Sequence, residues 1–249
     1  MIIYRSQQEI DKLRRSSALV AQTVQYLEPM VEPGVTTADL DRAAEVFIRQ
    51  HGGIPAFKGY RGFPATLCTS INAEVVHGIP SKKRKLRSGD IIGIDCGAIV
   101  DGYYGDHAVT LAVGEISSQE QELLQATREA LEEGIAQAKV GNRLSDISHT
   151  IQKYAEERGY SVVKAFVGHG IGTELHEEPQ VPNFGPPGRG PRLREGMVLA
   201  LEPMLNIGTA DVQILSDNWT VVTVDGKLSA HFEHTVAVAE HGGIVLSQP

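Results

Sequence analysis

The spacing of hydrophobic residues predicts four helices. Apolar side chains recur three and four positions apart in residues 6–31, 38–51, 117–139 and 144–158. Thr36 precedes the second segment and Ser117 precedes the third, while Gly52 follows the second and Gly159 follows the fourth. Hydroxyl side chains before a helix and glycine after it are common start and stop signals. The chain therefore contains two pairs of predicted helices.

Apolar runs predict six strands around these helices, at 91–100, 103–113, 197–206, 211–216, 219–224 and 231–239. The first two are separated by Asp-Gly at 101–102, a dipeptide favoured in two-residue hairpin turns. Such a turn places Asp95 opposite Ala108. Asp106 then lies opposite Gly97, on the same face as Asp95. The two aspartates become diagonal neighbours with backbones roughly 7–8 Å apart, so both side chains could bind one cation.

The two halves of the chain repeat each other. A shift of 107 positions superposes Gly34 on Gly141, Asp39 on Asp146, Gly52 on Gly159, Arg87 and Gly89 on Arg194 and Gly196, and Asp95 on Glu202. A longer shift places Asp106 on Glu233, within GDHAVTLAV and FEHTVAVAE. Such self-similarity indicates a duplicated unit. We therefore predict a single α+β domain over 1–249, with two pseudo-symmetric halves at about 1–114 and 115–249.

Four acidic residues lie in the interior of these apolar strands, away from their ends: Asp95, Asp106, Glu202 and Glu233. Each could be a hydrogen-bonded acid of the core. An unpaired carboxylate, however, is costly to bury, and a bound metal ion offsets that cost. A pseudo-twofold axis through the repeat would bring all four carboxylates together. Four carboxylates would neutralise two divalent ions, and such pairs activate water for hydrolysis. The pattern therefore predicts a dinuclear metal site.

The stretch VGHGIGTELHEEP at 167–179 places two histidines in a glycine-rich segment. A phosphate-binding loop would end in Gly-Lys-Ser/Thr and open a helix, whereas this stretch has no lysine and runs into proline. As a metal ligand, His169 would add one nitrogen to the carboxylate site, a combination that suits Mn, Co, Fe or Zn. His176 and His77 are candidates for hydrogen-bond donors near a reacting carbonyl. Either one could instead be an ordinary packed histidine.

The other histidines and the cysteines are expected to be structural. His107 and His234 directly follow two candidate ligands, so they point to the opposite face of their strands. Four histidines are expected to have no part in the chemistry, namely His51, His149, His231 and His241. Cys68 and Cys96 are the only cysteines, too few for a disulfide scaffold and consistent with a reducing cytoplasm.

Composition narrows the range of partners. The 249 residues carry a net charge of −8, which argues against specific DNA binding because nucleic-acid-binding surfaces are basic. No apolar stretch reaches the roughly 18 residues that a membrane span needs. The N-terminus lacks the pattern of a signal peptide, so we expect a cytoplasmic protein. The one basic run, SKKRKLR at 81–87, is either a solvated loop or a contact with ribosomal RNA.

Five segments together resemble the type I methionine aminopeptidases. They are SINAEVVHGIP, GDIIGIDCGAIVDGYYGDHAVTL, GHGIGTELHEEP, GMVLALEPM and HFEHTVAV, in order from about residue 60 to 240. The resemblance implies an internally duplicated pita-bread fold and a monomeric enzyme. It also implies removal of the initiator methionine from nascent proteins whose second residue is small, with two divalent cations of Co, Mn, Fe, Zn or Ni.

The resemblance also assigns residues to the site. The implied metal ligands are Asp95, Asp106, His169, Glu202 and Glu233, with Asp106 and Glu233 bridging both ions. His77 would position the substrate, His176 would stabilise the developing charge on the carbonyl oxygen, and we expect Glu202 to relay the proton. The implied substrate pocket consists of Tyr60, Phe63, Cys68, His77, Leu175, His176 and Trp219.

Two members of this pocket have open interpretations. Trp219 follows Asp217-Asn218, which resembles a turn, so its ring could simply pack on the core. Leu175 stands where the family commonly has an aromatic residue, which predicts a slightly looser pocket.

The protein's own Met1-Ile2 start should be spared, because Ile2 is not small.

Three alternatives remain. Proline-specific aminopeptidases and dipeptidases of the same fold usually carry an extra N-terminal domain, whereas here the first predicted helix begins within ten residues. Type II methionine aminopeptidases have a helical insertion between the two glutamate ligands, and the 31 positions from Glu202 to Glu233 leave no room for it. A non-catalytic relative acting as a binding protein would lack ligands, and all five are present.

Overall fold

Four α-helices form where the hydrophobic spacing predicts them. The computed structural model describes residues 1–249, and its helices are α1 (Gln7–Leu27), α2 (Thr37–Gln50), α3 (Ser118–Gln137) and α4 (Leu144–Glu156). Side chains of Ser6, Thr36 and Ser117 cap the first three helices by accepting from the third backbone N–H of each. The predicted first helix is too long, because Pro29 has no N–H for the α-helical bond, and residues 28–30 form a 3₁₀ turn.

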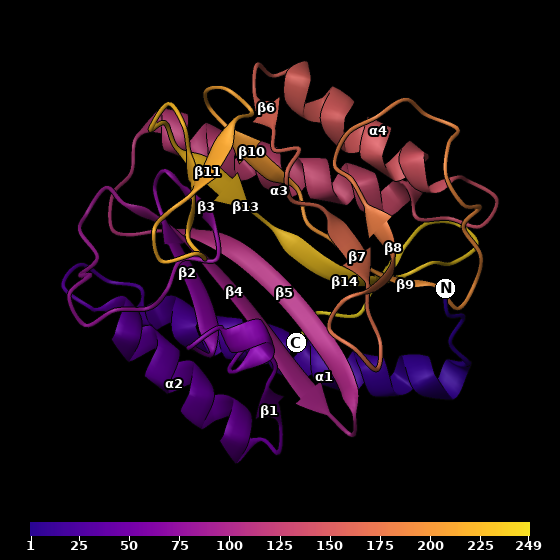
Figure 1. Cartoon of the computed structure of the whole chain (residues 1–249), viewed down its shortest axis with the longest axis horizontal. Coiled ribbons are helices and arrows are strands. Elements are labelled where there is room, and N and C mark those ends of the chain that lie inside the picture. The colour runs from indigo at the N-terminus through magenta and orange to yellow at the C-terminus, as the bar shows by residue number, and fades with distance from the viewer.

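The largest sheet is antiparallel and has nine strands. They are β1 (Ile54–Pro55), β2 (Leu67–Ile71), β4 (Ile91–Val100), β5 (Tyr103–Ala112), β7 (Gly168–Gly170), β8 (Glu177–Val181), β9 (Val198–Leu201), β14 (Glu233–Ala237) and β15 (Ile244–Val245). The order is β1-β4-β5-β14-β9-β7-β8, with β2 also paired to β4 and β15 to β14. In Figure 1, α1 and α3 lie behind these strands, with α2 and α4 further out at the bottom and top.

Two three-stranded sheets complete the fold. One has the order β13 (Ser229–His231), β10 (Met204–Asn206), β6 (Ser161–Val162), and the other β11 (Val212–Ile214), β12 (Val221–Thr223), β3 (Glu74–Val76). The predicted strands 197–206 and 231–239 are each split in two. Pro203 cannot donate to a ladder, and Phe232 N–H bonds the Pro203 carbonyl at 3.3 Å. The segment from β9 to β10 and the segment from β13 to β14 therefore leave the large sheet at the same point.

The β4–β5 hairpin has the predicted register. Asp95 pairs with Ala108, and Gly97 pairs with Asp106. Asp101 and Gly102 at the turn have φ values of 50° and 79°, the positive values that a type I′ turn requires at both positions. The turn chemistry readable from the sequence thus fixes the positions of two acids on one face of the sheet.

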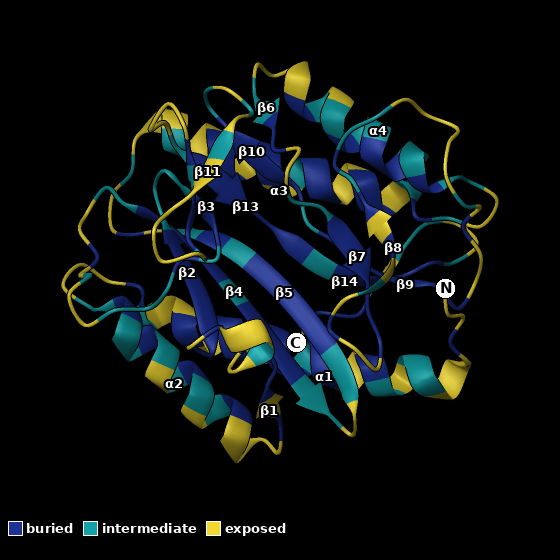
Figure 2. Ribbon diagram, viewed as in Figure 1, coloured by how far each residue is buried: buried dark blue, intermediate teal, exposed yellow.

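The elements of the repeat adopt matching backbone conformations. Gly52 and Gly159, which follow α2 and α4, have φ values of 80° and 82°, and Gly89 and Gly196 have 91° and 86°. One apolar core forms around α1, α2 and β4, and another forms around α3, α4 and β9. Figure 2 shows the central strands largely buried and the outer faces of the helices exposed. Each core therefore joins a pair of helices to strands of the large sheet.

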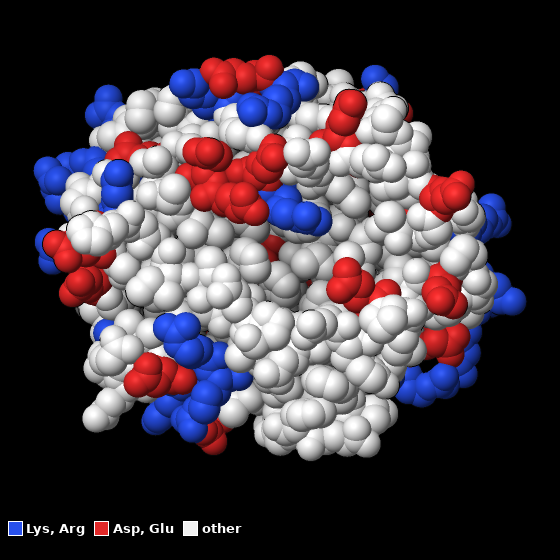
Figure 3. All heavy atoms as spheres, turned by 180° about the vertical axis from the view of Figure 1, so that it is seen from behind, with Lys and Arg blue, Asp and Glu red and all other residues white.

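The surface carries both signs of charge. Seen from behind, acidic and basic side chains are interspersed on the helical side of the molecule (Figure 3), despite the net charge of −8. No helix in the structure combines the length and hydropathy that a transmembrane span requires.

Candidate metal centre

Neighbouring strands bring candidate ligands into one row across the sheet. Cys68 on β2 pairs with Asp95 on β4, Asp95 with Ala108 on β5, and Ala108 with Glu233 on β14. Asp106 lies two positions from Ala108 on β5, on the same face. The small side chain of Ala108 leaves space between the acids on either side of it.

The C-terminal half supplies the other two candidate ligands. His169 lies on the short strand β7, and Glu202 lies at the break between β9 and β10. His169 Nε2 is 3.6 Å from a Glu202 carboxylate oxygen and 4.0 Å from an Asp106 carboxylate oxygen. One ligand atom each from Asp106, His169 and Glu233 lie within 4.8 Å of one another. The fold therefore gathers acids that are more than 120 positions apart in the chain.

The hydrogen bonding of His169 leaves one ring nitrogen free to bind a cation. Its Nδ1 is 2.9 Å from the carbonyl oxygen of Gly170. Because a carbonyl only accepts, the proton resides on Nδ1 and Nε2 carries a lone pair. Burial, together with the nearby His176 ring, lowers the pKa of His169 to about 3, so the ring is neutral. A lone pair facing carboxylates is the arrangement that a metal ion completes.

The chain provides no positive charge to balance the negative charges of the clustered carboxylates. Burial raises the pKa of Asp95 to about 7. Burial and then repulsion between neighbouring carboxylates raise the pKa values of Asp106, Glu202 and Glu233 well above normal. One carboxylate oxygen each of Asp95 and Glu233 is buried without a hydrogen-bond partner. Divalent cations would supply the missing positive charge, so these residues fit a metal site.

The backbone of one candidate ligand, Asp106, is held from a neighbouring strand. Thr235 on β14 accepts a hydrogen bond from Asp106 N–H at 3.1 Å and donates to the Asp106 carbonyl at 2.8 Å. Such support fixes where the carboxylate points, which metal ligands generally require.

Two further histidines lie beside the cluster. His176 Nδ1 is 2.9 Å from the Tyr60 hydroxyl, and its ring centroid is 4.2 Å from that of His169. Burial, then the charge of Arg61, lowers the pKa of His176 to about 4. His77 has a φ of 61°, an uncommon conformation for a residue with a side chain and one that often marks a functional site. Burial lowers the His77 pKa to about 4.

A cavity of about 160 Å³ unites the cluster with an apolar pocket. Its lining contains every candidate site residue of the sequence analysis, namely Tyr60, Phe63, Cys68, His77, Asp95, Asp106, His169, Leu175, His176, Glu202, Trp219 and Glu233. Residues 217–218 do form the expected turn, in which Asp217 accepts from the Trp219 N–H at 2.9 Å. The indole nevertheless packs edge-on against the Phe63 ring, with ring centroids 5.1 Å apart. Trp219 therefore both follows the turn and lines the cavity.

Residues 11–240 match metallopeptidase family M24. The chain belongs to metallopeptidase family M24. It is 56% identical to the methionine aminopeptidase of Clostridium acetobutylicum, over 99% of both chains. The crystal structure of methionine aminopeptidase from Thermotoga maritima superposes with a TM-score of 0.98 and 44% identity, over all of both chains. A prolidase from Pyrococcus horikoshii has a TM-score of 0.80 and 22% identity, covering all of this chain and 64% of its own.

These matches bear on the sequence predictions for this M24 metallopeptidase. The α+β pita-bread fold is confirmed by the solved structures that it superposes on. The resemblance drawn from the five segments is likewise confirmed by the family match and by relatives that align over the whole chain. Membership of a metallopeptidase family makes it a metal-dependent peptidase.

Three residues beside the carboxylate cluster were not among the candidate site residues of the sequence analysis. Phe57 and Arg61 line the cavity, and nothing in their local pattern sets them apart from other loop residues. His231, expected to have no part in the chemistry, has its Nε2 buried without a hydrogen-bond partner, 3.8 Å from a Glu202 oxygen. Its position two residues before Glu233 was the only available signal.

Proposed function

We propose that this chain is a methionine aminopeptidase that removes the initiator methionine from nascent proteins when the second residue is small. The cavity carries the proposal, because candidate ligands and an enclosed apolar pocket share one space of about 160 Å³. Relatives named methionine aminopeptidase align over the whole chain, which supports the same conclusion. We further propose that the protein acts as a monomer in the cytoplasm.

The metal site would hold two divalent cations of Co, Mn, Fe, Zn or Ni. The residues that would hold them are Asp95, Asp106, His169, Glu202 and Glu233, which all line the cavity. Bound divalent ions would polarise the scissile carbonyl and lower the pKa of a water molecule to near neutrality. A set of hard oxygen donors and one imidazole accepts several first-row metals.

The remaining polar residues would bind and orient the peptide. A hydroxyl of Tyr60 that donates to Nδ1 of His176 leaves the proton of the neutral ring on Nε2. That N–H would donate to the carbonyl oxygen as it gains charge. His77, held edge-on to Trp219 at 6.3 Å, would position the peptide. Glu202 would accept and relay the proton, because its carboxylate lies beside the proposed metal site, 3.6 Å from His169 Nε2.

The apolar walls suit an unbranched thioether. Aromatic rings such as Phe63 and Trp219 meet sulfur favourably, by about 0.3–1.5 kcal/mol, and both line the cavity. Leu175 closes another wall and is fully buried. A charged side chain would lose its hydration there without finding a partner, so Lys and Asp should be rejected as first residues.

The alternatives are less well supported. Proline specificity is not favoured, because the likeness to a prolidase is one of fold alone. A non-catalytic binding role leaves unexplained why buried carboxylates retain unpartnered oxygens.

Chelation of the purified protein followed by metal add-back tests the proposal. We expect chelation to abolish cleavage of Met-Ala-X peptides and each suitable divalent metal to restore it, with little cleavage of X-Pro peptides. Efficient X-Pro cleavage, or activity that survives complete metal removal, would contradict the assignment.

We also propose that the basic run 81–87 contacts ribosomal RNA. Lys82, Lys83, Lys85 and Arg87 are exposed, whereas Arg84 is held by Glu74 at 2.6 Å. Exposed cations bind phosphates with strong salt dependence. Co-sedimentation with ribosomes should weaken with salt and disappear when the charges of Lys82, Lys83 and Lys85 are reversed. Unchanged co-sedimentation would leave the run as a solvated loop.

A further inference from the structure

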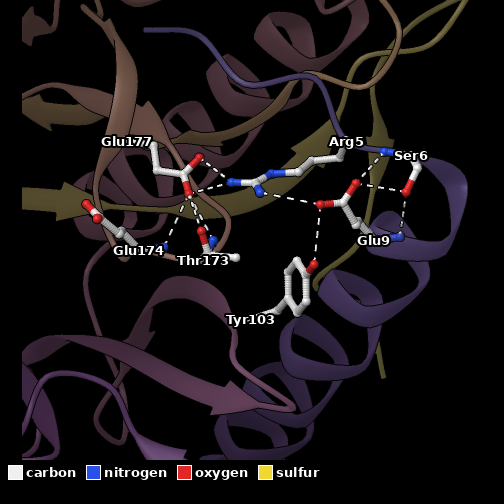
Figure 4. A network of polar contacts seen from close by, with 7 residues as sticks. All are labelled: Arg5, Ser6, Glu9, Tyr103, Thr173, Glu174 and Glu177. Atoms are coloured by element: carbon white, nitrogen blue, oxygen red, sulfur yellow. Dashed lines mark hydrogen bonds and ion pairs between the residues drawn. The ribbon is translucent and has the colours of Figure 1, made fainter.

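The N-terminal segment, residues 1–6, docks on the C-terminal half of the molecule. Arg5 N–H donates to the Gly196 carbonyl at 2.7 Å. The Arg5 side chain is 5% exposed, and its Nη2 lies 2.5 and 2.6 Å from the two carboxylate oxygens of Glu177. Figure 4 shows the guanidinium between Glu177 on one side and Glu9 of α1 on the other. The proposed chemistry does not use this buried pair.

Glu177 organises the loop that precedes it. One of its carboxylate oxygens accepts hydrogen bonds from the backbone N–H groups of Thr173 and Glu174, at 2.9 and 3.2 Å (Figure 4). The same oxygen accepts from Arg5. The carboxylate therefore closes a turn over residues 173–177, and Arg5 provides the positive charge that lets it remain buried.

The glycine pattern shows that the loop is built around this arginine. A Cβ at Gly168 or Gly170 would lie 2.3 Å from a backbone oxygen of a neighbouring strand. A Cβ at Gly172 would instead lie 2.0 Å from Nη2 of Arg5. The third glycine of the GHGIG run thus makes room for the guanidinium, whereas the first two allow strands to approach.

The turn over 173–177 carries two lining residues of the cavity, Leu175 and His176. The Tyr60 hydroxyl, from another segment of the cavity lining, forms a hydrogen bond with His176. We propose that Arg5 is a positioning residue, which through Glu177 fixes the turn and so places His176 and Leu175 against the substrate. The inference rests on the proposed function.

The first test measures the turn itself, without substrate or metal. Arg5→Ala should increase amide hydrogen exchange in residues 173–177 by about tenfold or more, because the closing carboxylate loses its charge partner. The control is Arg15→Ala, which removes an exposed pair at 2.9 Å between α1 and Asp101 of the β4–β5 turn. Exchange in 173–177 should not change in the control, and unchanged exchange in Arg5→Ala would overturn the inference.

The second test measures the consequence for catalysis. With Met-Ala-X peptides, Arg5→Ala should lower kcat about tenfold at unchanged metal content, and Arg5→Lys should recover part of the loss. In a His176→Ala background, Arg5→Ala should have no further effect on kcat, because its contribution to kcat acts through His176. A further tenfold loss in the double variant would overturn the positioning role.

These tests separate the inference from the proposed function. A wild-type protein that does not cleave Met-Ala-X peptides would refute the function, whereas the exchange experiment would still report on Arg5. If Arg5→Ala does not fold, Arg5→Lys and Glu177→Gln weaken the same pair and give the same comparison against Arg15→Ala.

Discussion

The two faces of β5 and β14 differ in how their polar groups are satisfied. Asp106 and Glu233 point to one face and line the cavity. The next residue on each strand, His107 and His234, points to the other face, between α1 and α3. The two histidines pair in register and stack with ring centroids 4.7 Å apart.

On the back face, the chain provides a hydrogen-bond partner for each of the two histidines. His107 Nδ1 is 2.5 Å from the Glu233 carbonyl oxygen, and His234 Nδ1 is 2.8 Å from the Ser247 hydroxyl. On the front face, by contrast, a carboxylate oxygen of Glu233 is buried without a partner. The comparison shows that burial of polar groups alone does not mark a functional site. Buried carboxylates that the chain leaves unpartnered do, because a cation must then supply the missing positive charge.

The largest expected effect comes from removing a carboxylate of the front face, the face of β5 and β14 that carries Asp106 and Glu233. Asp106→Ala or Glu233→Ala should abolish peptidase activity and weaken metal binding by more than the roughly 10–100-fold typical of residues that only support ligands. Both residues are proposed to serve both ions. Metal content after dialysis, with His234→Gln as the back-face control, measures the difference. Two ions bound at near-normal affinity by either alanine variant would contradict the dinuclear assignment.

The next effect separates two histidines of the front face. His169→Ala should reduce metal content, because it removes a proposed nitrogen ligand. His176→Ala should leave metal content nearly intact and lower kcat by roughly 10²–10³, the loss typical of one donor to a developing oxyanion. Metal analysis alongside steady-state kinetics distinguishes the variants. An equal loss of metal in both would overturn the division of roles.

A smaller effect sharpens the description of the pocket. Leu175→Phe adds an aromatic wall, and the contact between a ring and sulfur favours methionine over norleucine by about 0.3–1.5 kcal/mol. The ratio of kcat/KM for Met-Ala-X over norleucine-Ala-X should therefore rise, by at most about tenfold. In both proteins, peptides with a bulky second residue should be cleaved poorly. An unchanged ratio would remove Leu175 from the wall of the methionine pocket.

The smallest effect concerns stability on the back face. Burial lowers the pKa of His234 to about 3 in the folded protein. Below about pH 6.5, the histidine is therefore protonated in the unfolded state but remains neutral in the folded state. Stability is therefore present above that pH and is lost as the pH falls, by about 1.4 kcal/mol for this group at pH 5.5. Denaturant unfolding at pH 7.5 and 5.5 should show a smaller pH dependence in His234→Gln. Equal pH dependence in both proteins would refute the prediction.

Local sequence determined much of this architecture. Hydrophobic spacing and capping residues such as Thr36 and Ser117 placed the helices, because a helix depends on contacts three and four positions apart. The Asp101-Gly102 turn set the hairpin register and so the relation of Asp95 to Asp106. These features involve neighbours in sequence, which a pattern can capture.

Only the tertiary structure decided how distant segments meet. Arg5 and Glu177 are 172 positions apart, and neither shows in the sequence that it needs the other. The approach of His231 to Glu202 also depends on how distant elements pack. The same holds for the contact between Phe232 and Pro203, where two segments leave the large sheet. Such contacts follow from the packing of whole elements, and no local pattern of hydrophobic and polar residues encodes that packing.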